Sequence, residues 1–145
     1  MVFHCLYVNN ITVGVAGINR GDPARFPLHI GKVRRNDGMI SMADVMLAAE
    51  NCVTAGAKVI SISLSCGEKE TDIERCYTSE WDDQFQRIYD QNVLIIGAVG
   101  NTGNASNEHP GAYKTVMTVS AVDEQNMWYD ESTRNNQVEI AAPGV

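Results

Sequence analysis

The stretch Asn92–Gly103, NVLIIGAVGNTG, decides how the rest of this chain is interpreted. Its first half is a short apolar run, and the run stops abruptly at the glycines that flank Asn101. A short apolar run bounded by turn-forming residues is typical of a buried strand. Parallel α/β sheets collect their functional groups at the carboxyl ends of the strands, which is where Asn101 would lie. The stretch therefore predicts a core strand with a polar site at its end.

A helix and a strand are predicted upstream of this stretch. Ser41 and Asp44 resemble a helix-capping box, and apolar residues recur at helical spacing from Val45 through Cys52. Gly56 is a natural stop for this helix. The run VISISL at residues 59–64 is short and β-branched, so a strand is expected to follow.

A second helix is predicted from Ser79, with Trp81, Phe85 and Ile88 on one face, and it leads into a strand at 93–98. Strands that alternate with amphipathic helices favour an α/β fold with a mostly parallel sheet flanked by helices. Short apolar runs predict further strands at residues 13–18, 27–33, 116–122 and 137–141.

Composition bounds the class of protein. The 145 residues are 44% hydrophobic and 20% charged, which fits one globular domain or part of one. A net charge of -7 argues against nucleic acid as a partner, because phosphate backbones need a clustered basic surface. The longest apolar run, 93–99, is far shorter than the roughly 20 residues that span a bilayer, so no membrane partner is expected. Residues 1–8 do not have the pattern of a signal peptide.

The four cysteines do not follow the spacing of a zinc site. Cys52 falls on the apolar face of the first predicted helix, where a small buried side chain is expected. Cys66 and Cys76 bracket a polar segment, and two interpretations stay open for them: a disulfide in an oxidising compartment, or free thiols.

Five collinear segments resemble the catalytic domain of the subtilisin-like serine proteases (subtilases, the peptidase S8 family). They are NVLIIGAVGNTG itself, NNITVGVAG at 9–17, VISISLSCG at 59–67, HPGAYKTVMTVSAVD at 109–123, and the terminal AAPGV. Each is weak alone, but together they cover nearly the whole chain. The resemblance implies that residues 1–145 are a partial subtilase catalytic domain, with an incomplete form of that family's three-layer fold.

The same resemblance implies roles for individual residues. The Asn101 amide would donate a hydrogen bond to the oxyanion of a tetrahedral intermediate. Substrate would be held by the backbone of a strand end, by a pocket wall and by residues near the pocket base. In that order these are Ser63, Leu64 and Ser65; Ala98, Val99 and Gly100; and His109, Pro110 and Gly111. The family cleaves after fairly large apolar residues, but it usually has glycine where Ser65 stands, and Thr102 is a further departure.

A catalytic triad is not expected within these residues. In the family the nucleophile segment would follow Val145 and the catalytic histidine motif would precede Asn9, while His4 does not fit that motif. The chain alone is therefore not expected to hydrolyse peptides. Asn10 matches a loop that binds calcium in many members, which makes structural calcium a weak expectation, and no cofactor is required. Family habit implies a polypeptide substrate and an extracellular or secretory location.

Three other classes are alternatives to this interpretation. A non-catalytic subtilase-like module would keep the peptide groove without the chemistry. A nucleotide-binding Rossmann-like domain is suggested by Gly97, Gly100 and Gly103, but their spacing is wrong and the polar segment after them does not favour the helix that a phosphate site needs. A cysteine protease built on Cys5 or Cys66 lacks a cysteine–histidine context.

Overall fold

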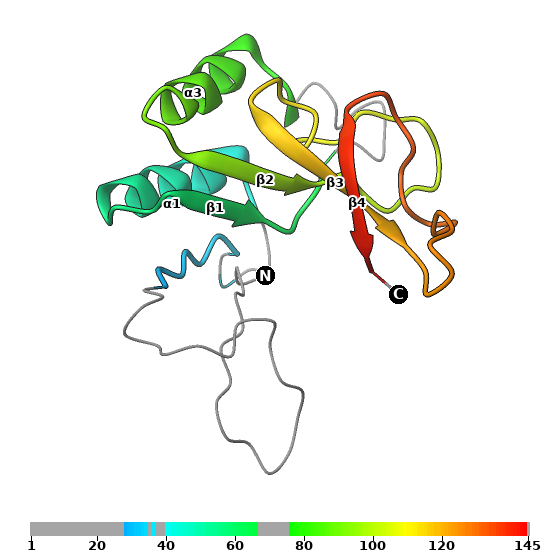
Figure 1. Cartoon of the computed structure of the whole chain (residues 1–145). Helices are drawn as coiled ribbons and strands as arrows, with labels where there is room; N and C mark the ends of the chain where they lie inside the picture. Colours follow the sequence, from blue (N-terminus) through cyan, green and yellow to red (C-terminus); the bar gives the residue numbers. More distant parts are fainter. Residues whose placement is uncertain (1–27, 35, 37–39, 67–75, 145) are drawn as a thin grey trace, which may run out of the picture.

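The computed structural model describes residues 28–34, 36, 40–66 and 76–144. Its strands form one sheet in the order β1-β2-β3-β4, and every neighbouring pair is parallel (Figure 1). This confirms the α/β fold with a parallel sheet. The elements in chain order are α1 (Met42–Thr54), β1 (Val59–Ile62), α3 (Ser79–Tyr89), β2 (Leu94–Ala98), β3 (Val116–Val122) and β4 (Val138–Pro143).

Local sequence explains where the two helices begin. At α1 the Ser41 side chain accepts from the Asp44 backbone, and the Asp44 side chain accepts from the Ser41 backbone, so the predicted capping box is confirmed. At α3 the cap is Thr78, one residue before the predicted start at Ser79, and its hydroxyl accepts from the Trp81 backbone. Thr78 takes this role because its backbone is extended while Ser79 is already helical.

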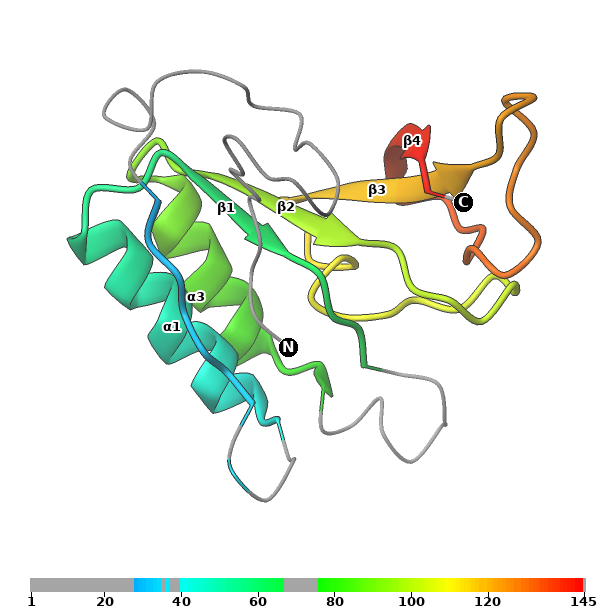
Figure 2. The ribbon, with the colours of Figure 1, turned by 90° about the horizontal axis from the view of Figure 1, so that it is seen from below.

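The core lies between one face of the sheet and the two helices. Figure 2 shows α1 and α3 side by side on the same side of the sheet. Phe85 of α3 is fully buried, and it belongs to one apolar cluster with Ile62 of β1 and Ile95 of β2. Ile60 and Ile62, alternate residues of β1, both belong to this cluster, since side chains change faces along a strand, whereas no residue of β4 belongs to it. The buried face therefore fixes the register of the strands.

The opposite face of the sheet is not covered by helices within the described ranges. Val59 and Ile140 are each more than half exposed, at 55% and 51%. β1 thus alternates between exposed and buried residues in place of apolar burial on both faces, while β4 is exposed or half-buried throughout. A cavity of about 320 Å³ opens on this face, over the carboxyl ends of the strands.

Two strand predictions have other outcomes. The expected strand at 13–18 lies outside the described residues. Within the expected strand at 27–33, the described residues 28–33 form no named strand, but Lys32 takes part in a single β-bridge. The segment also lies along α1, where Gly31 approaches Ala48 so closely that an added Cβ would be 3.0 Å from the Ala48 Cβ. The strands at 59–64, 93–98 and 137–141 are present with ends shifted by one or two residues, and 116–122 is confirmed.

Candidate functional site

A tight turn at the end of β2 presents Asn101. Gly100 has φ +105, which glycine adopts far more readily than other residues, and Asn101 follows it with an exposed side chain. The turn is fixed on both sides: Val99 donates to the Val119 carbonyl, and Thr102 donates to the Thr133 hydroxyl. No hydrogen bond joins the Asn101 amide to any described residue, so its NH2 group is available to a ligand.

The end of β1 lies beside this turn. Ser63 and Ser65 are exposed, whereas Leu64 between them is half-buried and packs against the core cluster. The cavity on the open face brings Ser63 together with Ala98, Val99, Gly100 and Asn101. Because β1 is an edge strand of the described sheet, its backbone beyond Ile62 could pair with an extended peptide.

The loop at 108–111 lies behind these two strand ends. His109 and Cys66 exchange two backbone hydrogen bonds of 2.9 Å, which attach the loop to the end of β1. Gly111 packs on the end of β2, where an added Cβ would overlap the Ala98 carbonyl oxygen. The His109–Pro110 peptide bond is cis. His109, Pro110 and Gly111 are therefore buried beneath the strand ends and do not line the cavity.

Glu108 is the first residue of this loop, and the sequence analysis predicted no role for it. It is 1% exposed. Its Oε1 accepts from the hydroxyls of Thr102 at 3.0 Å and Thr133 at 2.9 Å, and those hydroxyls are 2.8 Å apart. Thr133 also donates its backbone N–H to the Gly100 carbonyl. One polar network thus joins the Asn101 turn to the buried carboxyl group.

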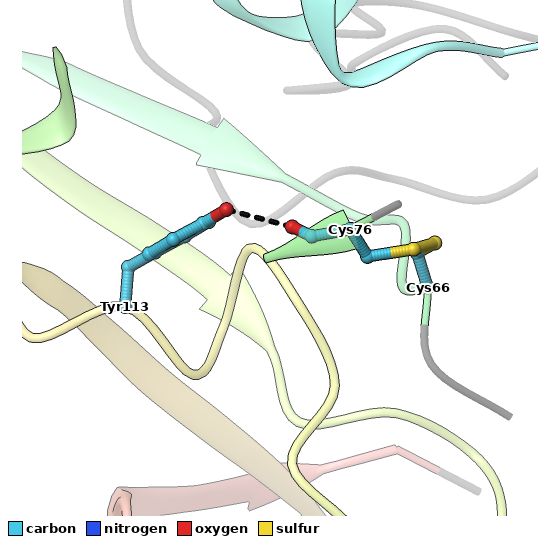
Figure 3. The surroundings of a disulfide bond; sticks show 3 residues. All are labelled: Cys66, Cys76 and Tyr113. Carbon is cyan, nitrogen blue, oxygen red and sulfur yellow. Dashed lines mark hydrogen bonds between the residues drawn. A yellow bond between two sulfur atoms is a disulfide. The ribbon is translucent and has the colours of Figure 1, made fainter. Parts of the chain in front are cut away.

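A disulfide joins Cys66 to Cys76 (Figure 3). It lies next to the attachment of His109 at Cys66. The Tyr113 hydroxyl donates to the Cys76 carbonyl at 2.7 Å, as Figure 3 shows, and this ties the end of the 108–113 loop to the same cystine. Cys52, on the buried face of α1, is a free thiol, and burial raises its pKa.

Aromatic rings surround His109 below the site. Its ring centroid lies 4.6 Å from that of Tyr113 and 5.1 Å from that of Tyr77. Burial lowers the pKa of His109, because the charged form loses hydration, and Asp82 opposes this only in part. Burial likewise raises the pKa of Tyr113. His109 and Tyr113 therefore stay neutral near pH 7, and their rings pack beneath the strand ends.

The structure leaves the calcium expectation as a prediction. Asn10 lies outside the described residues. Within the described part of the chain, no group of three or more histidine, cysteine, aspartate or glutamate side chains could hold a metal ion. No helix in that part is long and apolar enough to cross a membrane.

The fold and site together define a class: a parallel α/β sheet with an amide donor on a glycine turn, beside a free strand end. Residues 11–145 match the family model described as the subtilase family, peptidase S8. The chain belongs to the subtilase family.

Relatives and solved structures agree with this assignment. The chain is 29% identical to the thermostable alkaline protease of Halalkalibacterium halodurans, over 94% of this chain and 34% of that protein. It is 26% identical to thermitase of Thermoactinomyces vulgaris, over 94% of this chain and 45% of that one. The subtilisin-like protease Apa1 of an Antarctic Pseudoalteromonas matches 78% of this chain and 24% of its own, with 32% identity and a TM-score of 0.67. The chain thus spans less than half the length of these relatives.

Proposed function

We propose that this chain forms the oxyanion-binding and substrate-binding part of a serine endopeptidase. One observation carries the proposal: the Asn101 amide has no hydrogen-bond partner among the described residues and projects from the Gly100 turn beside the cavity. A donor fixed in this way stabilises the negative charge that develops on the carbonyl oxygen during attack on a peptide bond.

The remaining residues would position a polypeptide substrate. The backbone at Ser63, Leu64 and Ser65 would pair with the peptide as an added strand. Ala98, Val99 and Gly100 would form the wall of the pocket for the residue before the scissile bond, with Pro110 and Gly111 buried below them. No serine, histidine or aspartate of a triad is assigned in this chain.

The same proposal includes an extracellular or secretory location. A disulfide forms and persists in oxidising compartments, which fits the bond between Cys66 and Cys76. One relative, 41% identical over 64 residues, is named the minor extracellular protease Epr of Bacillus subtilis. Calcium at Asn10 stays part of the proposal as an optional structural ion.

The test uses the natural protein that contains these residues. Hydrolysis of a mixed set of fluorogenic peptides is measured before and after treatment with an organophosphorus inhibitor directed at active-site serines. We expect hydrolysis that the inhibitor abolishes. Peptide binding without hydrolysis would instead support the non-catalytic module, and hydrolysis that survives the inhibitor would exclude the serine mechanism.

A further inference from the structure

The loop after the Asn101 turn contains the tripeptide Asn104-Ala105-Ser106. An asparagine followed by any residue except proline, and then by serine or threonine, is the acceptor pattern for N-linked glycosylation. The same pattern at Asn10 lies outside the described residues. Because the attached sugar is bulky and polar, a folded protein can carry it only where the asparagine side chain reaches the surface. The surroundings of Asn104 therefore decide whether the pattern can be used.

Asn104 lies at the surface, in a segment without helix or strand. The side chains of Asn104 and Ala105 are exposed. No residue of the range 101–107 belongs to the hydrophobic core cluster. A sugar attached to Asn104 would thus extend into solvent without displacing a core side chain.

Hydrogen bonds hold the Asn104 carboxamide by its oxygen. Oδ1 accepts from the Ser106 backbone N–H at 2.8 Å and from the Thr102 hydroxyl at 2.8 Å. The first contact closes an Asx turn, and it identifies the oxygen, since a backbone N–H can only donate. Nδ2 has no hydrogen-bond partner among the described residues. Glycosylation substitutes Nδ2 and leaves Oδ1 as an acceptor, so both contacts would survive the modification.

The backbone fixes this loop to the segment at 134–135. The Asn104 carbonyl accepts from the Arg134 N–H at 2.7 Å, and the Ser106 carbonyl accepts from the Asn135 side chain at 2.9 Å. Neither contact involves the atom that would carry the sugar. The loop therefore presents Nδ2 of Asn104 without using it for its own structure.

The disulfide between Cys66 and Cys76 is an independent observation that points to the same route. Disulfides form and persist in oxidising compartments, which include the lumen of the endoplasmic reticulum. N-linked sugars belong to proteins that pass through a secretory route. A chain that acquires this disulfide there would also meet the donor of the sugar.

We propose that Asn104 carries an N-linked glycan. Nδ2 forms a bond to the anomeric carbon of the first sugar of a lipid-linked pyrophosphate oligosaccharide. The bond from that carbon to the pyrophosphate oxygen breaks, the lipid pyrophosphate leaves with the bonding electrons, and Nδ2 loses one proton. No oxidant or reductant is consumed. This inference rests on the secretory location that is part of the proposed function, and it places the glycan in the loop that follows the Asn101 turn.

The experiment maps the modification on the natural protein isolated from its source. The protein is treated with peptide N-glycosidase in water enriched in heavy oxygen, digested and analysed by mass spectrometry. Release of a glycan by this enzyme converts the asparagine to aspartate and incorporates heavy oxygen. We expect labelled aspartate at position 104 and unchanged Asn107, which is exposed in the same loop but lacks the acceptor pattern. Unmodified Asn104, or label that appears equally without the enzyme, would overturn the proposal.

Variants separate the acceptor pattern from other causes of the label. They are expressed in eukaryotic cells, and both secreted and cell-retained protein are mapped, so a folding defect does not hide the result. Ser106→Ala leaves Asn104 in place but removes the hydroxyl that the pattern requires, so the glycan should be lost. Ser106→Thr and Asn107→Gln should retain it. A glycan that persists at Asn104 in Ser106→Ala, or is lost in Ser106→Thr, would overturn the proposal.

The glycan and the peptidase function fail in different measurements. Glycosylated Asn104 in a protein that does not hydrolyse peptides would contradict the peptidase function and leave the glycan standing. Inhibitor-sensitive hydrolysis by a natural protein whose Asn104 is unmodified would support the peptidase function and overturn the glycan.

Discussion

Replacing Gly100 by alanine tests how the Asn101 turn is built. Two effects act at this position: its φ of +105 is unfavourable for any residue with a Cβ, and the new Cβ would overlap the Glu108 carboxyl group. Holding a non-glycine residue at such a φ costs about 1–3 kcal/mol, and forcing an extra methyl into a packed site costs about 1–3 kcal/mol more. We therefore expect Gly100→Ala to lower the free energy of unfolding by about 2–6 kcal/mol.

Gly56→Ala is the matched control. Gly56 has φ +87, but no atom lies within 4 Å of the position of an added Cβ. This variant should show the backbone effect alone, about 1–2 kcal/mol. The difference between the two variants then reports the overlap with Glu108.

The assay is urea unfolding of the natural protein, followed by tryptophan fluorescence, with m-values compared between variants. The double variant Gly100→Ala/Glu108→Ala should be more stable than additivity predicts, by about 1–3 kcal/mol, because removing the carboxyl group relieves the overlap. Equal losses for Gly100→Ala and Gly56→Ala, or a strictly additive double variant, would refute the placement of Glu108 against the turn.

Three further predictions concern the support below the site. Tyr113→Phe should cost about 1 kcal/mol by leaving the buried Cys76 carbonyl without its donor, while Tyr89→Phe at an exposed position should cost almost nothing in the same unfolding assay. Burial lowers the pKa of His109 in the folded state below its usual 6.5, so the unfolded chain binds more protons at acidic pH. Stability should thus fall as the pH drops from about 7 to 5, and His109→Gln should make that fall shallower; an unchanged pH profile would contradict the burial of this ring. Replacing Cys66 and Cys76 together by serine opens a 10-residue loop and should lower the free energy of unfolding by about 2–3 kcal/mol, measured against the oxidised wild type.

Most of the helices and strands could be predicted from local sequence patterns. The capping box at Ser41 and the period of Phe85 and Ile88 act within a few residues, so they define their helices without tertiary information. Strand 116–122 could be placed for the same reason, since its apolar run is bounded by turns. The segment at 27–33 has a comparable pattern, but its described residues form only a single β-bridge at Lys32, and its Gly31 lies close to Ala48 of α1.

Only part of the candidate site could be predicted from the sequence. Asn101 could be found because its flanking glycines are adjacent in the chain. Glu108 could not, because its burial depends on Gly100 and on Thr133, which lies 25 residues away. A glutamate in a polar segment is normally exposed, and nothing local marks this one as buried. The only sequence signal is its place immediately before His109 and Pro110, in a loop that the strand ends cover.

The central claim is that Asn101 donates to the oxyanion of a peptide-hydrolysing centre. The most direct measurement is kcat for Asn101→Ala in the natural protein, compared with Asn107→Ala at an exposed position in the same loop. We predict a loss of about 10²- to 10³-fold in kcat with little change in KM, a magnitude already known for one such donor in subtilisin, a member of this family. An Asn101→Ala variant that retains the kcat of the wild type would contradict the claim.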